Sequence, residues 1–167
     1  MDPKAFKEQI NNFVPSEFPE SVLYGHSNLF FALDKYRDLL GSYVYPSPEP
    51  GALARTTNDE IDSTHYANLN MTIRSKAADV FVVERIDRAF MIALSSQLFG
   101  GIGVYGDTKF RSKQWPMLHL DIRPLGQGHS KETALIWMRI KGKYIYPQYE
   151  EYGEVLLFNF LMNQSKR

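Results

Sequence analysis

The stretch Met117-Leu-His-Leu-Asp-Ile-Arg123 carries the pattern on which the interpretation of this chain depends. Apolar residues alternate in it with His119 and Asp121, and this period of two predicts a β-strand. Residues i and i+2 of a strand point to the same face, so the imidazole and the carboxylate are expected side by side. Such a pair is a common part of a zinc site, which needs further ligands from elsewhere in the chain.

Few residues can supply those ligands. The chain contains no cysteine, so disulfides and thiolate ligands are excluded, and a metal must be bound by His, Asp or Glu. Of the four histidines, His26 stands near a predicted helix start and His129 lies in a Gly-rich loop. Neither is expected to be a ligand, which leaves His65 and His119 with the carboxylates near them.

Composition excludes several classes of protein. The 19 basic and 19 acidic residues balance to a net charge of zero, which argues against nucleic-acid binding and against a polybasic membrane surface. No apolar run approaches the roughly 20 residues that span a bilayer. Residues 1–7 lack the apolar region of a signal peptide, so we expect a cytoplasmic protein or export by another route.

The order of apolar patterns predicts an α+β fold, with a mostly antiparallel sheet flanked by helices. The segment 154–162 fits either a helix or a strand, and the irregular stretch 46–62 has the length of a functional loop. The other expected elements are helices over 3–13, from an N-cap at Ser27 to Gly41, and over 85–99, and strands over 42–45, 71–74, 77–83, 102–105, 117–122, 133–140 and 143–146.

Asp79 interrupts the otherwise apolar strand 77–83. A buried carboxylate is costly unless it is paired or binds a metal, although backbone N–H groups or an Arg can also satisfy it. His119 taken alone fits an ordinary core histidine equally well. Asp79, His119, His65 and Asp121 taken together favour a metal site.

Four segments carry a resemblance to a known family: Ser63-Thr-His65, Ala77-Ala-Asp-Val-Phe81, Gly100-Gly-Ile-Gly-Val-Tyr105 and His119-Leu-Asp-Ile-Arg123. Together they resemble the zinc peptidases that cleave peptidoglycan stem peptides. These are the D-alanyl-D-alanine carboxypeptidases and the phage-type L-alanyl-D-glutamate endopeptidases, which share a fold with the hedgehog signalling domain. The resemblance implies a bound Zn²⁺ with His65, Asp79 and His119 as ligands, and a substrate-binding Arg at Arg55.

The length of the chain indicates a single domain over 1–167. It divides into an N-terminal helical extension (1–27), a peptidase-like core (28–125) and a C-terminal hairpin with a terminal segment (126–167). Two departures stand out. His65 and Asp79 are fourteen residues apart where the family has about seven, which implies an insertion within 66–76. Pro116 occupies the position where many relatives carry a catalytic acid.

Asp121 therefore has two possible roles, as the catalytic base that accepts the water proton or as the group that orients a ligand imidazole. Arg55 either pairs with a substrate carboxylate or a developing oxyanion, or is a solvated loop residue. Asp107 is expected to cap a turn rather than reach the site. The tyrosines Tyr144, Tyr146, Tyr149 and Tyr152 fit either a peptide or glycan groove or the closing of a sheet edge.

Three hypotheses follow. The first is a zinc-dependent metallopeptidase of phage or bacterial origin, a hydrolase whose partner is the peptide of peptidoglycan in the cell wall and which acts there once released. The second is a non-catalytic, peptidase-like protein that keeps its zinc site, has a structural role and associates with virion proteins. The third is a plain α+β binding domain in which the histidines belong to the core.

Overall fold

The computed structural model describes residues 1–57, 62–126 and 133–166. It has an α+β architecture with a mostly antiparallel sheet, as the sequence predicted. The helices are α1 (Pro3–Gln9), α2 (Ser27–Leu40), α3 (Ile86–Ser95) and α4 (Gly153–Gln164), with short 3-10 helices η1 (Pro15–Glu17), η2 (Val22–Tyr24) and η4 (Pro147–Tyr149). The strands are β1 (Val44–Pro46), β2 (Ala77–Val82), β3 (Gly101–Tyr105), β4 (Lys109–Phe110), β5 (Lys113–Gln114), β6 (Met117–Asp121), β7 (Leu135–Ile140) and β8 (Lys143–Ile145).

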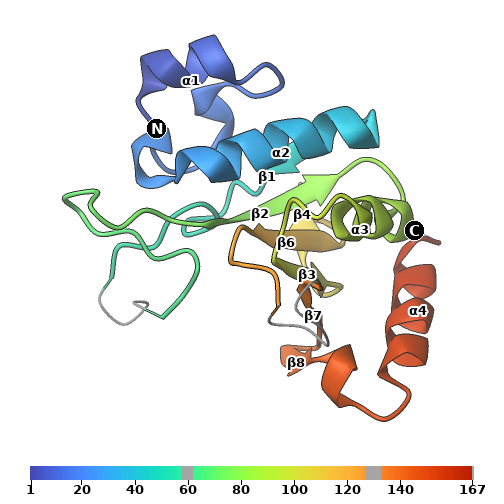
Figure 1. Cartoon of the computed structure of the whole chain (residues 1–167). Helices are drawn as coiled ribbons and strands as arrows, with labels where there is room; N and C mark the ends of the chain where they lie inside the picture. Colours follow the sequence, from blue (N-terminus) through green and yellow to red (C-terminus); the bar gives the residue numbers. More distant parts are fainter. Residues whose placement is uncertain (58–61, 127–132, 167) are drawn as a thin grey trace.

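Six strands form the main sheet in the order β1-β2-β6-β3-β7-β8, and β4 and β5 form a separate hairpin (Figure 1). Every neighbouring pair in the main sheet is antiparallel except β3 and β7, which run parallel. The strand β6 lies between β2 and β3. The sheet therefore brings the Ala77–Val82 and Gly101–Tyr105 segments to either side of the stretch that contains His119.

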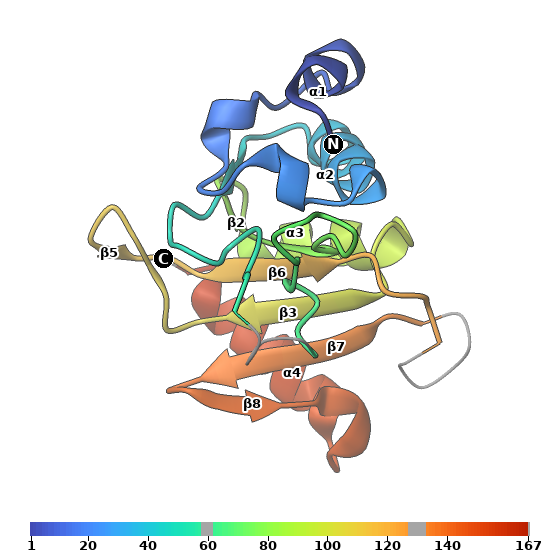
Figure 2. The ribbon, with the colours of Figure 1, turned by 90° about the vertical axis from the view of Figure 1, so that its left-hand side faces the viewer.

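The period-two pattern gives the sheet two different faces. The helix-packed face carries small and aliphatic side chains that join α2, α3 and α4 in one core: Ala78, Val80, Val82, Ile102, Val104, Leu118, Leu120 and Met138. The opposite face, here called the site face, carries Asp79, Phe81, Tyr105, Met117, His119, Asp121 and Trp137. Figure 2 shows α3 and α4 behind the sheet and the chain between β1 and β2 in front of it.

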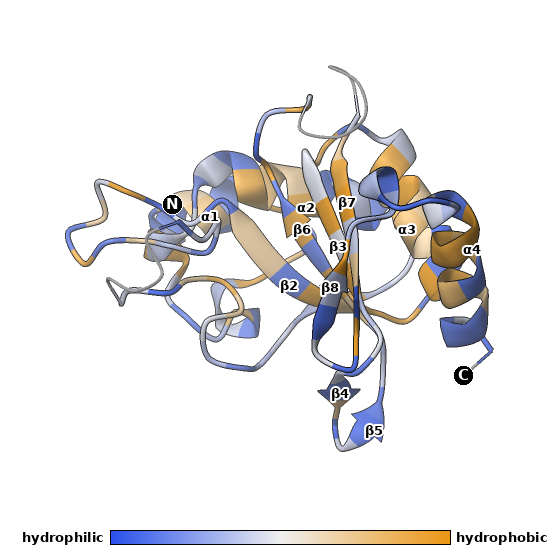
Figure 3. Ribbon diagram, turned by 90° about the horizontal axis from the view of Figure 1, so that it is seen from below, coloured by the Kyte–Doolittle hydropathy of each residue, from blue (hydrophilic) through white to orange (hydrophobic). Residues whose placement is uncertain are grey.

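The hydropathy of the elements follows this division. In Figure 3 hydrophobic residues follow the strands of the main sheet and much of α3 and α4.

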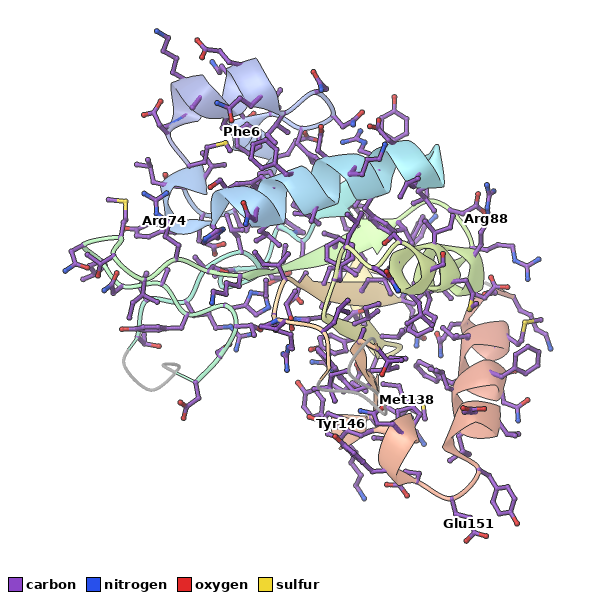
Figure 4. All side chains as sticks on the ribbon, viewed as in Figure 1. Phe6, Arg74, Arg88, Met138, Tyr146 and Glu151 are labelled. Atoms are coloured by element: carbon purple, nitrogen blue, oxygen red, sulfur yellow. The ribbon has the colours of Figure 1, made fainter. Side chains whose placement is uncertain are left out.

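The N-terminal helix is attached to the core by aromatic rings, since Phe6 contacts both Phe18 and Phe30 edge to face, with centroids 5.9 and 4.9 Å apart. Figure 4 shows Phe6 between α1 and α2. No helix in the described part of the chain is both long enough and apolar enough to cross a bilayer.

Several predicted boundaries were wrong for local reasons. The first helix ends at Gln9, because Ile10 is extended and the next two backbone N–H groups bind the Asp34 carboxylate. The N-cap of α2 is His26 rather than Ser27, since His26 Nδ1 accepts the N–H of Asn28.

The predicted strand over 71–74 is a turn instead. Asn68 Oδ1 accepts the N–H of Ile73, and Met71 has a positive φ of 60°. The β7–β8 hairpin around Lys141 and Gly142 is confirmed, with positive φ at both turn residues, as a type I′ turn requires. The open choice for the terminal segment is resolved as the helix α4.

Candidate metal centre

The described residues contain one buried group of side chains that can hold a metal ion: His65, Asp79 and His119. Asp79 on β2 and His119 on β6 are directly opposite each other in the antiparallel register. His65 comes from the segment between β1 and β2, which crosses the site face. All three side chains are buried, as a dry metal site requires.

Backbone hydrogen bonds hold His65 in place. The N–H of Arg55 donates to the His65 carbonyl at 2.8 Å, and the N–H of Ala67 donates to the Arg55 carbonyl at 2.9 Å. The N–H of Lys76 donates to the Thr64 carbonyl, which ties the segment to the start of β2. The residues between His65 and Asp79 include the 68–74 turn, in which Asn68 Oδ1 accepts the N–H of Ile73.

The three donor atoms have spacings that fit one metal ion. His119 Nδ1 lies 3.0 Å from Asp79 Oδ1 and 3.0 Å from His65 Nε2, and His65 Nε2 lies 3.5 Å from Asp79 Oδ1. Donors bonded to one tetrahedral ion at about 2.0–2.1 Å lie about 3.3 Å apart. The arrangement brings two imidazole nitrogens and a carboxylate oxygen to one point, as zinc and other divalent transition metals prefer.

The protonation of the group depends on burial and on its internal contacts. Burial lowers the pKa of His65 and favours the neutral imidazole, which is the form that binds metals. Burial also lowers the pKa of His119, but contacts with Asp121 and Asp79 outweigh it and raise that pKa to about 9. For Asp79 burial raises the pKa, and the contacts with His119 and His65 more than reverse that shift. Without a metal, a charged His119 offsets the two carboxylates beside it.

Asp121 lies on the opposite side of the His119 ring from Nδ1, the nitrogen that faces Asp79 and His65. Its Oδ2 lies 3.1 Å from His119 Nε2, while Nδ1 faces Asp79. Arg123 donates to Asp121 through its backbone N–H at 3.0 Å and through its guanidinium at 2.6–2.9 Å. The Asp121 side chain is 0% exposed, and these contacts hold its pKa below the usual range despite the opposing effect of burial. A carboxylate in this place fixes the orientation of the imidazole.

Two glycines of β3 make room for these contacts. Gly103 is paired with His119 on one side and Trp137 on the other, and a Cβ on Gly103 would overlap the Trp137 indole. The indole therefore crosses β3 and reaches His119, with ring centroids 4.9 Å apart. A Cβ on Gly101 would likewise overlap the carboxylate of Asp121. The alternation of glycines in Gly101–Gly103 thus leaves space on the site face.

Comparison with family models, curated proteins and solved structures found no match for this chain.

A cavity of about 430 Å³ lies on the Asp79 side of the ligand group. Arg55 and Asp79 both line it, so the structure brings the predicted substrate-binding Arg to the same cavity as a predicted ligand. Lys109 and Arg139 add two further basic groups, and Glu49 adds a carboxylate. A second cavity, of about 190 Å³, lies on the His119 side.

The remaining predicted residues lie elsewhere. Asp107 accepts the N–H of Gly142 at 2.8 Å and the Arg139 guanidinium at 2.9 Å, which is a turn-stabilising role. His26 caps α2, and His129 lies outside the described residues. The sequence interpretation missed Trp137 and Glu49. The alternation of β7 placed Trp137 on one face of a strand, but nothing in it indicated that β7 neighbours β3.

Proposed function

We propose that this protein is a zinc-dependent peptidase that hydrolyses stem peptides of peptidoglycan, with a hedgehog/DD-peptidase-like fold. The observation that carries the proposal is the buried group of His65, Asp79 and His119, whose donor atoms lie 3.0–3.5 Å apart. The pairing of the Gly-rich strand β3 with the His-x-Asp strand β6 adds support, because the resembling family has the same neighbours.

Zinc bound by these three residues would lower the pKa of a coordinated water to about 7 and polarise a scissile carbonyl. Side chains of the protein itself bind the substrate and transfer the proton. Arg55 lines the larger cavity next to Asp79, where a guanidinium can bind a substrate carboxylate or a developing oxyanion. Lys109 adds a second basic group to the same cavity, whereas Arg139 is already paired with Asp107.

Asp121 takes the orienting role in this proposal. It is fully buried, its oxygens contact Arg123 and His119, and it lies behind the imidazole rather than beside the metal-facing nitrogen. Proton transfer then needs another carboxylate that faces the cavity. Glu49 lines that cavity and is exposed, so it takes the role of general base in place of Asp121.

A second function is supported by a specific observation, the absence of an acid at Pro116 combined with the burial of Asp121. A chain without a working base would keep the metal and lose turnover. It would then serve as a non-catalytic, metal-stabilised module with a structural or virion-associated role.

Release of new amino groups from purified peptidoglycan tests the proposal. The zinc-loaded protein is expected to release amines, the chelated protein to release none, and zinc to restore the activity. Glu49→Gln is expected to abolish release while zinc remains bound at one ion per chain. Bound zinc with no amine release from any peptidoglycan chemotype would favour the non-catalytic function, and absence of bound metal would overturn both.

A further inference from the structure

The smaller cavity has a composition that the peptidase chemistry does not use. It lies against His119 and is lined by the aromatic rings of Tyr105, Trp137, Tyr144 and Tyr146, with Asp62 and Arg123 among the polar groups. Its volume of about 190 Å³ is below the roughly 300–1,000 Å³ of sites for drug-sized ligands. It therefore has room for one ring-sized group.

The aromatic side chains form a continuous surface from the metal centre to the β8 edge of the sheet. The ring centroids of Trp137 and Tyr146 lie 6.4 Å apart, and those of Tyr105 and Tyr144 lie 6.0 Å apart. Tyr149 continues the row, 6.2 Å from Tyr146. Figure 4 places Tyr146 near the β8 end of the molecule, away from the N-terminal helices.

The inner and outer rings differ in exposure. Trp137 and Tyr105 are buried against His119, whereas Tyr144 is 51% exposed and Tyr146 is 37% exposed. Exposed tyrosines offer an apolar ring face together with a hydroxyl group, at the cost of few rotatable bonds. A sheet edge that was merely closed by these tyrosines would not leave their rings lining an open cavity.

We propose that this cavity binds one pyranose ring of a glycan strand. A pyranose has an apolar C–H face, which stacks on an aromatic ring, and hydroxyl groups around its edge. The Asp62 carboxylate and the Arg123 guanidinium lie among the lining groups as hydrogen-bonding partners for those hydroxyls.

The two cavities then divide the substrate between them. The His119 side holds the sugar, and the Asp79 side, with Arg55, holds the peptide, so the ligand group lies between them. The identity of the sugar as part of peptidoglycan rests on the proposed function. The affinity of the cavity for a pyranose does not.

Titration of the full chain with tri-N-acetylchitotriose tests the proposal, in zinc-loaded and in chelated protein. The chain has two tryptophans, so the Trp115→Phe variant leaves Trp137, in the cavity wall, as the single fluorescent reporter. Saturable binding is expected in both metal states. Tyr146→Ala and Tyr144→Ala are each expected to weaken it about tenfold, as loss of one stacking contact implies.

Two variants control for indirect effects. Tyr146→Phe keeps the ring and is expected to retain most of the affinity. Tyr43→Ala removes a tyrosine that is 60% exposed beside β1, at the other edge of the sheet, and is expected to change nothing. Equal binding by Tyr146→Ala and wild type, or no saturation by about 10 mM sugar, would overturn the proposal.

A third probe separates this proposal from the peptidase function. D-alanyl-D-alanine is expected to compete with the trisaccharide weakly or not at all, and competition lost in Tyr146→Ala would make the cavity a peptide site. Amine release without sugar binding would refute the sugar site alone. Sugar binding without amine release would refute the peptidase alone.

Discussion

Asp79 and His119 are cross-strand partners in the antiparallel pair β2 and β6, and Asp79 Oδ1 lies 3.0 Å from His119 Nδ1. The pairing places a carboxylate and an imidazole together on rigid strands, where backbone hydrogen bonds fix the distance between them. His65 completes the group from a loop that is itself bonded to Arg55 and Lys76 through the backbone.

His119→Ala is expected to abolish stoichiometric metal binding, because removal of one of three protein ligands leaves two. Metal content measured by mass spectrometry after dialysis checks this. His26→Asn is the matched control: it removes another imidazole while Asn keeps the cap of α2. Equal metal content in His119→Ala and wild type would show that the ion binds elsewhere.

Removal of the metal is expected to lower the thermal midpoint of unfolding. A ligand at 100 times its dissociation constant stabilises the folded state by about 2.7 kcal/mol. For a chain of this size that corresponds to about 5–10 °C. Scanning calorimetry with and without a chelator measures the shift, and His119→Ala should show none.

Asp121→Asn is expected to weaken zinc affinity about 10–100-fold, the usual effect of losing a carboxylate that orients a ligand imidazole. Titration against a competing chelator measures it. If Asp121 were instead the general base, the affinity would stay the same and amine release alone would fall. The two roles that the sequence left open thus give different results with one variant.

Gly103→Ala is expected to destabilise the protein by about 1–3 kcal/mol, because the new methyl group overlaps the Trp137 indole. Urea unfolding measures the loss. The loss in free energy of unfolding caused by Gly103→Ala is expected to be smaller in a Trp137→Ala background, where the overlapping ring is absent. The same cost in both backgrounds would mean that the strain lies in the backbone and not in the indole.

Arg55→Ala is expected to lower kcat/KM for peptidoglycan fragments about 10–100-fold with no change in metal content, since a lost bond to a charged group costs about 1.5–3 kcal/mol. The backbone bonds of residue 55 to the His65 segment remain in this variant. Arg88→Ala, an exposed Arg paired with Glu84, is the control. A parallel loss of zinc would mean that Arg55 acts on the ligand segment rather than on substrate.

Alternation in the sequence predicted which residues share a face, but alternation does not indicate which strands are neighbours. Alternation within 117–122 put His119 on one face of a strand, and Asp79 stood out as the single acid in the otherwise apolar strand 77–83. The structure brings both together with His65. The parallel pairing of β7 with β3 depends on tertiary packing that leaves no local pattern. Trp137 was missed for that reason, since its contact with His119 crosses a neighbouring strand through the space left by Gly103.

The wrong end of the first helix and the overlooked Glu49 also result from contacts between residues far apart in the sequence. The apolar spacing at 3–13 predicted a longer helix, but the Asp34 carboxylate of α2 competes for the backbone N–H groups of Asn11 and Asn12. Glu49 was overlooked because the 46–62 stretch has no periodicity, and its place in the wall of the larger cavity depends on tertiary packing. The catalytic roles of Asp121 and Arg55 stay predictions.

Because the two faces of the sheet differ, a deletion within a strand would affect the core and the candidate metal site together. Deleting one residue within β6 would turn His119 and Asp121 toward the helices and bring Leu118 and Leu120 under the loops. The same alternation of side chains along β6 therefore places the core residues on one face and the candidate metal ligand His119 on the other. Selection for folding alone would therefore keep Asp79 and His119 side by side on the site face, whereas His65, which comes from a loop, depends on the backbone bonds of that loop.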